Sequence, residues 1–66
     1  MKVTVNGKVV ELRQGMTVLE YLREKKVNPD GVIVVYNSDV LNREDWDATV
    51  LKEEDTVEIL TMMGGG

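Results

Sequence analysis

The dipeptide Asn6-Gly7 restricts the fold of this chain more than any other feature, because it lies between two short segments of alternating apolar residues. Asn-Gly favours the two-residue turn whose twist matches that of paired antiparallel strands, so the pattern predicts a hairpin over residues 1–12. Such a turn sets three pairs of residues opposite each other: Val5 with Lys8, Val3 with Val10, and Met1 with Leu12. The last two pairs are entirely apolar, and opposed residues share a face. We therefore expect those four side chains on the core face of the hairpin.

A helix is predicted to begin directly after Thr17. Thr17 and Glu20 have the spacing of a capping box, in which each side chain bonds to the backbone of the other residue. Met16 and Tyr21 occupy the positions of a hydrophobic staple, which fixes the entry of the chain into the helix. The expected apolar stripe of the helix consists of Val18, Leu19 and Leu22.

The end of this helix is also marked in the sequence. Lys25 and Lys26 fall in the expected last turn, where positive charge suits the carbonyl end of a helix. The segment Asn28-Pro29-Asp30-Gly31 then forms a strong stop, because proline disfavours continuation of a helix and its neighbours favour turns.

Three further strands are expected after the helix. Residues 32–36 form a nearly continuous run of apolar residues, most of them β-branched, which is typical of a central strand. A short strand follows around Val40-Leu41, and the last strand runs from Thr56 to Met62. Between them, we expect a helical turn at residues 43–46 and a polar turn at residues 52–55.

This order of elements predicts an α+β domain of the β-grasp, or ubiquitin-like, class. The expected architecture is a mixed sheet of four or five strands with one main helix packed across one face. The parallel pairing of the first and last strands is inferred from knowledge of that fold and not from periodicity. We expect the domain to comprise residues 1–63, followed by a flexible C-terminal glycine tail at residues 64–66.

The composition argues against several classes of function. The 66 residues include no Cys and no His, so the chain lacks a nucleophilic thiol, the commonest metal ligand and the commonest general acid–base. Its acidic residues show no ligand spacing, and we expect neither a metal site nor catalysis by the chain alone. The net charge of −4 disfavours nucleic acid and anionic membranes as partners. With no long apolar run and no signal-peptide pattern, we expect a cytoplasmic protein.

The glycine tail is the candidate functional site. Gly64-Gly65-Gly66 follows the apolar run of the last strand. A chain of glycines is thin and tolerates any backbone angle, so it can thread a narrow channel and present a terminal carboxylate at Gly66 to the active site of another protein. Gly64 is expected to extend this tether. The alternative interpretation is a cloning remnant or a frayed end without function.

Apolar residues next to the tail form a candidate docking surface. If Val57 and Ile59 face the helix, strand alternation turns Glu58, Leu60 and Met62 toward solvent. The expected docking residues are Leu60, Met62, Met63, Val35 and Ile33. Exposed apolar side chains gathered beside a reactive end indicate a partner-binding patch. The alternative is an ordinary scatter of exposed apolar residues.

Three other groups of residues are expected to have structural roles. Trp46 is expected to anchor the small core rather than to contact a partner. Arg43 and Glu44 are expected to form a solvated pair, with contact to a partner as the alternative. The segment Glu53-Glu54-Asp55 is expected to be a solvated turn.

Several segments of the chain match one known family. They are Val5-Asn6-Gly7, Gly15-Met16-Thr17-Val18, Asn37 at a strand end, Asn42-Arg43-Glu44-Asp45-Trp46, and Gly65-Gly66. On these residues, and over essentially its whole length, the sequence resembles the bacterial ThiS family of sulfur carriers in thiamine biosynthesis. The Arg-Glu-x-Trp stretch is the most discriminating match, because a terminal diglycine also occurs in molybdopterin-synthase small subunits, tRNA-thiolation carriers and ubiquitin-like modifiers. Two departures are Glu54-Asp55, where the family often has Gly-Asp, and the additional Gly64.

The resemblance implies a carrier that binds no cofactor of its own. A partner adenylyltransferase, similar to ubiquitin-activating enzymes, would use ATP to activate the Gly66 carboxylate. Sulfur from a cysteine desulfurase would then produce a terminal thiocarboxylate, and thiazole synthase would take that sulfur for the thiazole ring of thiamine. Alternatives that stay open are delivery to molybdopterin or to a tRNA base, conjugation to protein lysines, and a binding module whose tail has no role.

Overall fold

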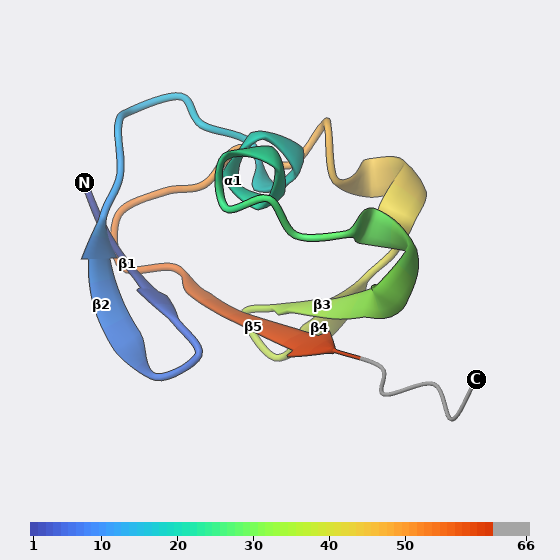
Figure 1. Ribbon diagram of the computed structural model, residues 1–66. Helices are drawn as coiled ribbons and strands as arrows, with labels where there is room; N and C mark the ends of the chain where they lie inside the picture. Colours follow the sequence, from blue (N-terminus) through green and yellow to red (C-terminus); the bar gives the residue numbers. More distant parts are fainter. Residues whose placement is uncertain (62–66) are drawn as a thin grey trace.

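The first and last strands of the chain lie side by side within one sheet (Figure 1). The computed structural model describes residues 1–61. Its elements are β1 (Lys2–Val5), β2 (Lys8–Glu11), α1 (Val18–Glu24), the 3₁₀ turn η1 (Pro29–Gly31), β3 (Val32–Tyr36), β4 (Asp39–Leu41), the 3₁₀ turn η2 (Arg43–Asp45) and β5 (Thr56–Thr61). The strand order is β2-β1-β5-β3-β4, in which β1 and β5 are parallel and the other neighbours antiparallel. One helix crosses one face of this mixed sheet, which confirms the predicted β-grasp class.

The Asn6-Gly7 turn joins β1 to β2 as predicted. Both residues have positive φ angles, 50° for Asn6 and 81° for Gly7, which the two-residue turn requires and which Asn and Gly adopt most readily. The register confirms two of the predicted pairs: Val5 with Lys8, and Val3 with Val10. The N–H of Leu12 donates to the carbonyl of Met1 at 2.8 Å, which agrees with the third predicted pair, Met1 with Leu12. Val3 is fully buried, and the other three predicted core-face residues pack against the core.

The predicted capping box begins α1. The N–H of Glu20 donates to Thr17 Oγ1 at 3.1 Å, and the N–H of Thr17 donates to Glu20 Oε1 at 2.9 Å. Each bond satisfies a backbone donor that lacks a partner at the start of a helix. Met16 and Tyr21, at the positions of the predicted hydrophobic staple, are both buried.

The end of α1 differs from the expectation. Arg23 is the basic residue of the last turn, and Lys25 is already the C-cap, so the placement of Lys25 and Lys26 in the last turn is wrong. Lys26 has a φ angle of 58°, and its N–H donates to the Arg23 carbonyl at 3.1 Å. The N–H of Val27 then reaches the Leu22 carbonyl at 3.0 Å. These two bonds form a Schellman cap, which ends the helix early and lets Val27 pack against the core.

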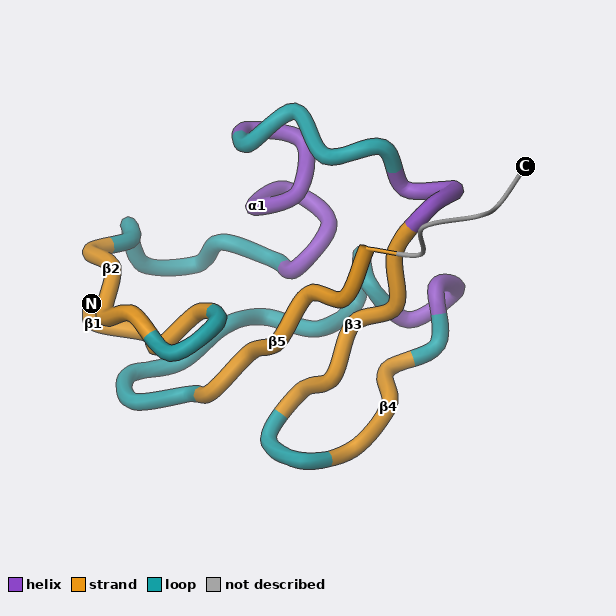
Figure 2. The backbone as a smooth tube through the Cα atoms, turned by 60° about the horizontal axis from the view of Figure 1, so that its bottom comes forward, coloured by secondary structure: helices purple, strands orange, loops and turns teal. Residues whose placement is uncertain are grey.

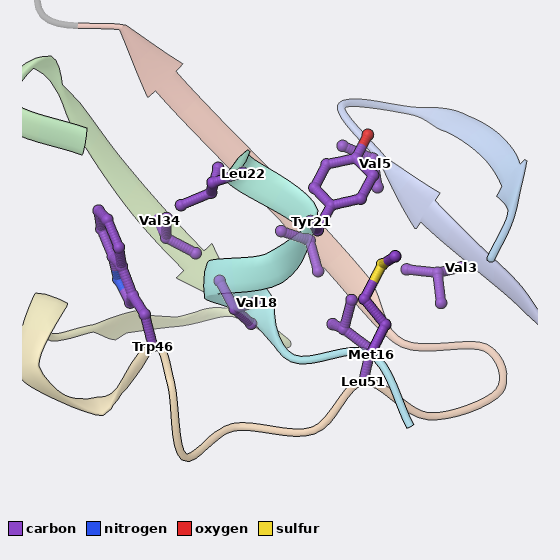
Figure 3. Close-up of a cluster of buried hydrophobic side chains, with 10 residues drawn as sticks. Val3, Val5, Met16, Val18, Tyr21, Leu22, Val34, Trp46 and Leu51 are labelled. Carbon is purple, nitrogen blue, oxygen red and sulfur yellow. The ribbon is translucent and has the colours of Figure 1, made fainter. Parts of the chain in front are cut away.

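The core lies between α1 and the covered face of the sheet (Figure 3). It contains Val3, Val5, Val34 and Val57 from the strands, Val18, Tyr21 and Leu22 from α1, and Met16, Trp46 and Leu51 from connecting segments. Trp46 is only 2% exposed, and its indole N–H donates to the Leu41 carbonyl at 3.2 Å. This position confirms Trp46 as a packing anchor.

Asp55 is buried, with 7% of its surface exposed, although the sequence predicts a solvated turn at this position. The two glutamates before it are exposed. The carboxylate of Asp55 accepts hydrogen bonds from the Tyr36 hydroxyl at 2.6 Å, the Asn37 side-chain amide at 3.1 Å and the Lys52 N–H at 2.8 Å. The expectation is wrong because donors distant in the sequence converge on this carboxylate and replace its water. The bonds from Tyr36 and Asn37 connect the beginning of β5 to the end of β3.

This cluster shifts two pKa values. Burial by itself raises the pKa of the Asp55 carboxyl, but hydrogen bonds from Tyr36, Asn37 and the Lys52 backbone, with the Lys52 charge, outweigh it and hold the pKa below its ordinary value of 3.8. Burial is also the largest cause at Tyr36, and the bond to Asp55 and its negative charge add to it, which raises the pKa of Tyr36 to about 12. The folded protein therefore favours an ionised Asp55 and a neutral Tyr36.

Replacing Lys26 by glycine is expected to stabilise the domain by about 0.5–1 kcal/mol, because glycine adopts the left-handed conformation without steric cost. In a domain of this size, that gain raises the unfolding midpoint by roughly 2–8 °C. Lys25→Gly is the matched control, because Lys25 has a φ angle of −87° and glycine there only adds freedom to the unfolded chain. Thermal unfolding followed by circular dichroism compares the variants. A Lys26→Gly variant that melts no higher than wild type contradicts this account of the cap.

Asp55→Asn is expected to lower the free energy of unfolding by about 2–4 kcal/mol near neutral pH, because an amide places a donor against the donors that surround the carboxylate. The exposed Asp47 supplies the control variant, Asp47→Asn. Because folding lowers the pKa of Asp55, its contribution is present above the unfolded-state pKa and is lost as the pH falls through the folded-state pKa. Urea unfolding at about pH 7 and about pH 2 measures both effects. An Asp55→Asn deficit that is equally large in acid contradicts the role assigned to the carboxylate.

Candidate functional site

One face of the sheet is left uncovered by α1, and we call it the open face (Figure 2). Alternation along β5 decides which side chains lie on it. Val57 is 2% exposed and belongs to the core, whereas Leu60 is 50% exposed. Ile59 is half-buried and packs against the core, and Glu58 is exposed. The orientation that the sequence predicts for β5 is therefore confirmed.

Four apolar residues of β3, β4 and β5 form the open-face patch, which consists of Ile33, Val35, Val40 and Leu60. The register sets Ile33 directly opposite Leu60, and Val35 directly opposite Val40. Ile33 is 38% exposed and Val40 is 68% exposed. Because opposed residues on one face of a sheet have their Cβ atoms about 4.5–5.5 Å apart, the four side chains form one continuous surface.

The structure brings together three of the five expected docking residues. Leu60, Val35 and Ile33 all belong to the open-face patch. Met62 and Met63 lie outside the described residues, as do the tail residues Gly64, Gly65 and Gly66. Leu60 directly precedes Thr61, the last described residue, so the patch occupies the strand that leads toward the glycines in the sequence.

Sequence reasoning missed Val40 as a member of the patch. The available signal was the dipeptide Asn37-Ser38, because asparagine favours the two-residue hairpin turn. The structure shows such a turn there, with φ angles of 49° and 77°. Such a turn pairs Val35 with Val40, as the structure shows. The pairing rule applied to residues 1–12 would have identified Val40 as well.

The acidic side chain of Glu58 borders the patch. It is exposed on β5 and lies directly opposite Val35. Within residues 1–61, the ion pairs involve other carboxylates: the N-terminus pairs with Glu11, Arg13 with Glu24, and Arg43 with Asp30. Over this part of the chain, the carboxylate of Glu58 has no cationic partner.

A groove of about 580 Å³ lies on the other side of the molecule, between α1 and η2. Leu22, Trp46 and Arg43 are among the residues that line it. The Arg43 guanidinium pairs with the Asp30 carboxylate at 2.6 Å and lies 6.0 Å from the centroid of the Trp46 ring. The expected pair of Arg43 with Glu44 is therefore wrong, because η1 brings the carboxylate of Asp30 closer to the guanidinium. This ion pair ties η1 to η2.

Over residues 1–61, the open face gathers exposed apolar side chains. Over residues 1–61, no three side chains of the kinds that ligate metals are grouped together. In the same part of the chain, no helix is long and apolar enough to cross a membrane. The chain also has no Cys or His with which to assemble a nucleophile and its base.

Two solved structures of similar proteins come from the same organism. The crystal structure of the thiamine biosynthesis protein ThiS from Geobacter metallireducens matches with a TM-score of 0.87 and 43% identity, and all of both chains is covered. A solution structure of a thiamine biosynthesis protein from the same organism matches with a TM-score of 0.81 and 45% identity, over all of this chain and 88% of that one. The similarity therefore includes both fold and sequence.

Two curated relatives differ in length. The sulfur carrier protein TtuB of Thermus thermophilus is 36% identical over 59 residues, which are 89% of this chain and 85% of that protein. A thiazole synthase of Magnetococcus marinus is 33% identical over 66 residues, and this chain spans only 20% of its length. The model described as the ThiS family matches residues 3–66. Because that match covers nearly the whole chain, the protein belongs to the ThiS family.

Proposed function

We propose that this chain is a sulfur carrier whose Gly66 carboxylate is adenylated and then converted to a thiocarboxylate, which donates sulfur for the thiazole ring of thiamine. The ThiS family match carries this proposal, because it extends through Gly66 and so includes the glycine tail. Two relatives support it. One is named a sulfur carrier protein, and the other is named a thiazole synthase and contains a segment similar to this entire chain.

Activation comes first because a carboxylate is a poor electrophile. Attack of a Gly66 carboxylate oxygen on the α-phosphate of ATP releases pyrophosphate and leaves an acyl-adenylate. AMP is a good leaving group and departs with one of the two carboxylate oxygens when a persulfide derived from the desulfurase attacks the acyl carbon. A thiol of the partner machinery then reduces the resulting acyl disulfide, forming a disulfide with the carrier sulfur of the persulfide and releasing the thiocarboxylate. The thiocarboxylate sulfur is soft and nucleophilic, which suits it to donation in the receiving enzyme.

The catalytic groups for these steps belong to partner proteins. This chain has no Cys and no His, and its buried Asp55 carboxylate is already occupied by hydrogen bonds. ATP is bound by an adenylyltransferase, sulfur originates from a cysteine desulfurase, and thiazole synthase receives it, all in the cytoplasm. A carrier without cysteine also cannot pass its sulfur to thiols of its own.

In this proposal, residues 1–63 are the domain that a partner binds, and residues 64–66 are the tail that carries the reactive carboxylate. The domain docks through the open-face patch, whose contiguous apolar side chains are typical of an interaction surface. Docking through β5 suits this task, because the strand that carries Leu60 also leads to the glycines in the sequence. A partner that holds the patch can therefore receive the tail in its active site.

Carrier chemistry would also suit molybdopterin synthesis or tRNA thiolation, and a terminal diglycine would suit a protein modifier. Thiazole formation is favoured because both Geobacter metallireducens structures are named as thiamine biosynthesis proteins. Recovery of a molybdopterin-synthase large subunit rather than thiazole synthase in a pull-down would redirect the proposal to that destination.

Deletion of Gly66 is expected to abolish adenylation and leave folding intact, because the new terminal carboxylate falls short of its position by one residue, about 3.3–3.6 Å. ATP–pyrophosphate exchange by the purified adenylyltransferase measures activation, and thermal unfolding checks the domain. A folded deletion variant that still supports exchange and sulfur donation at the wild-type rate overturns the proposed function.

Leu60→Asp is expected to weaken binding of the adenylyltransferase by about tenfold or more, because it places a charge inside the apolar contact. Val50→Asp is the matched control. Val50 is 47% exposed in the segment between η2 and β5, so the control makes the same kind of change away from the open face. Isothermal titration calorimetry measures both affinities. Equal losses for the two variants contradict docking through the open-face patch.

A further inference from the structure

Glu58 lies where the open-face patch meets the polar part of the open face. Val35 is directly opposite on β3, and Leu60 follows two positions later on the same face. On the other side of β5, the strand β1 presents Thr4 opposite Thr56. The carboxylate of Glu58 is therefore a charged group at the edge of an apolar surface.

Covering this edge without compensation is unfavourable. An ionised carboxylate loses much of its hydration when a protein surface closes over it, and either a paired opposite charge or several converging hydrogen-bond donors, as at Asp55, must replace that water. Within residues 1–61, no Lys, Arg or N-terminal amine forms an ion pair with Glu58. A partner that covers the patch must therefore supply this compensation itself, and a cation does so most strongly because its hydrogen bonds to a carboxylate are charge-assisted.

A second copy of this chain does not meet that requirement. Two-fold stacking of the open faces sets the same surface of each copy against the other. When one patch stacks on the other, the residues of the patch that can face Glu58 are apolar, and none of them supplies a cation. Each copy also carries a net charge of −4, which opposes association. The open face therefore fits a different protein, one that has a basic group next to an apolar contact surface.

We propose that Glu58 is a specificity determinant of the docking surface and receives a guanidinium group of the adenylyltransferase that activates Gly66. This inference rests on the proposed function, which supplies the partner. A guanidinium fits better than an ammonium because it is planar, binds a carboxylate through two parallel hydrogen bonds and is weakly hydrated. It can therefore lie against apolar side chains such as Val35 and Leu60. Glu58 acts by positioning the partner and takes no part in the chemistry.

The test measures how tightly the purified cognate adenylyltransferase binds wild type, Glu58→Gln, Glu58→Lys and Glu44→Gln. Glu44 is exposed in η2 beside the groove, so Glu44→Gln removes the same charge away from the open face. We expect Glu58→Gln to weaken binding about tenfold, Glu58→Lys about a hundredfold or more, and Glu44→Gln less than about twofold. All four proteins should share one unfolding midpoint to within about 2 °C, because both positions are exposed.

Equal affinities for Glu58→Gln and Glu44→Gln, with binding still weakened by Leu60→Asp, overturn the role of Glu58 and leave the carrier proposal standing. Undiminished adenylation of the Gly66 deletion variant overturns the proposed function instead. Sedimentation equilibrium adds a third check. A stable wild-type dimer that Leu60→Asp dissociates assigns the open face to a second copy and also overturns the inference.

Discussion

The position of β5 between β1 and β3 is the constraint on which the rest of this fold depends. Three side chains hold it there: one belongs to the residue that precedes β5, and the other two belong to the hairpin turns. The Asp55 carboxylate binds donors at the end of β3, the Asn37 side-chain oxygen accepts from the Thr56 N–H at 2.8 Å, and the Asn6 side-chain oxygen accepts from the Ile59 N–H at 2.8 Å. Asn6 and Asn37 each also supply a positive φ angle to a hairpin turn. Each asparagine therefore shapes a turn, and its side chain accepts a hydrogen bond from a backbone N–H of β5 just beyond the end of the neighbouring strand.

Fixing β5 divides its side chains between two environments. Val57 and Ile59 pack toward α1, while Glu58 and Leu60 lie on the open face. The helix α1 is only seven residues long and covers one face, so the opposite face keeps its apolar side chains exposed. A domain this small needs most of its apolar surface for the core, so an exposed apolar patch is better explained by a partner than by a contribution to stability. The fold thus exposes, on the strand that precedes the glycines in the sequence, the surface through which we propose that the carrier docks.

Local signals in the sequence were sufficient for much of this structure. The Asn6-Gly7 turn, the Thr17–Glu20 capping box and the alternation along β5 depend on neighbours a few residues away, and all three were predictable. The burial of Asp55 was not, because its donors Tyr36 and Asn37 lie 19 and 18 residues away. The pairing of Arg43 with Asp30, 13 residues away, has the same cause. The early end of α1 is local, but the sequence signal was absent, because the left-handed cap position is occupied by Lys26 and not by glycine. The outward orientation of Leu60 and its grouping with Ile33 and Val35 were predicted, whereas Val40, which lies opposite Val35, was missed.

Intact-mass spectrometry of the protein from its native cells, after treatment with a thiol-alkylating reagent, tests the central claim most directly. The chain has no Cys, so an alkyl group can report a terminal thiocarboxylate without interference from side-chain thiols. Fragmentation locates the label and separates it from methionine oxidation, whose mass gain is almost the same as that of replacing oxygen by sulfur. The account predicts alkylation at Gly66 in cells starved of thiamine. An unlabelled carboxylate at Gly66 throughout, under the same starvation, would contradict it.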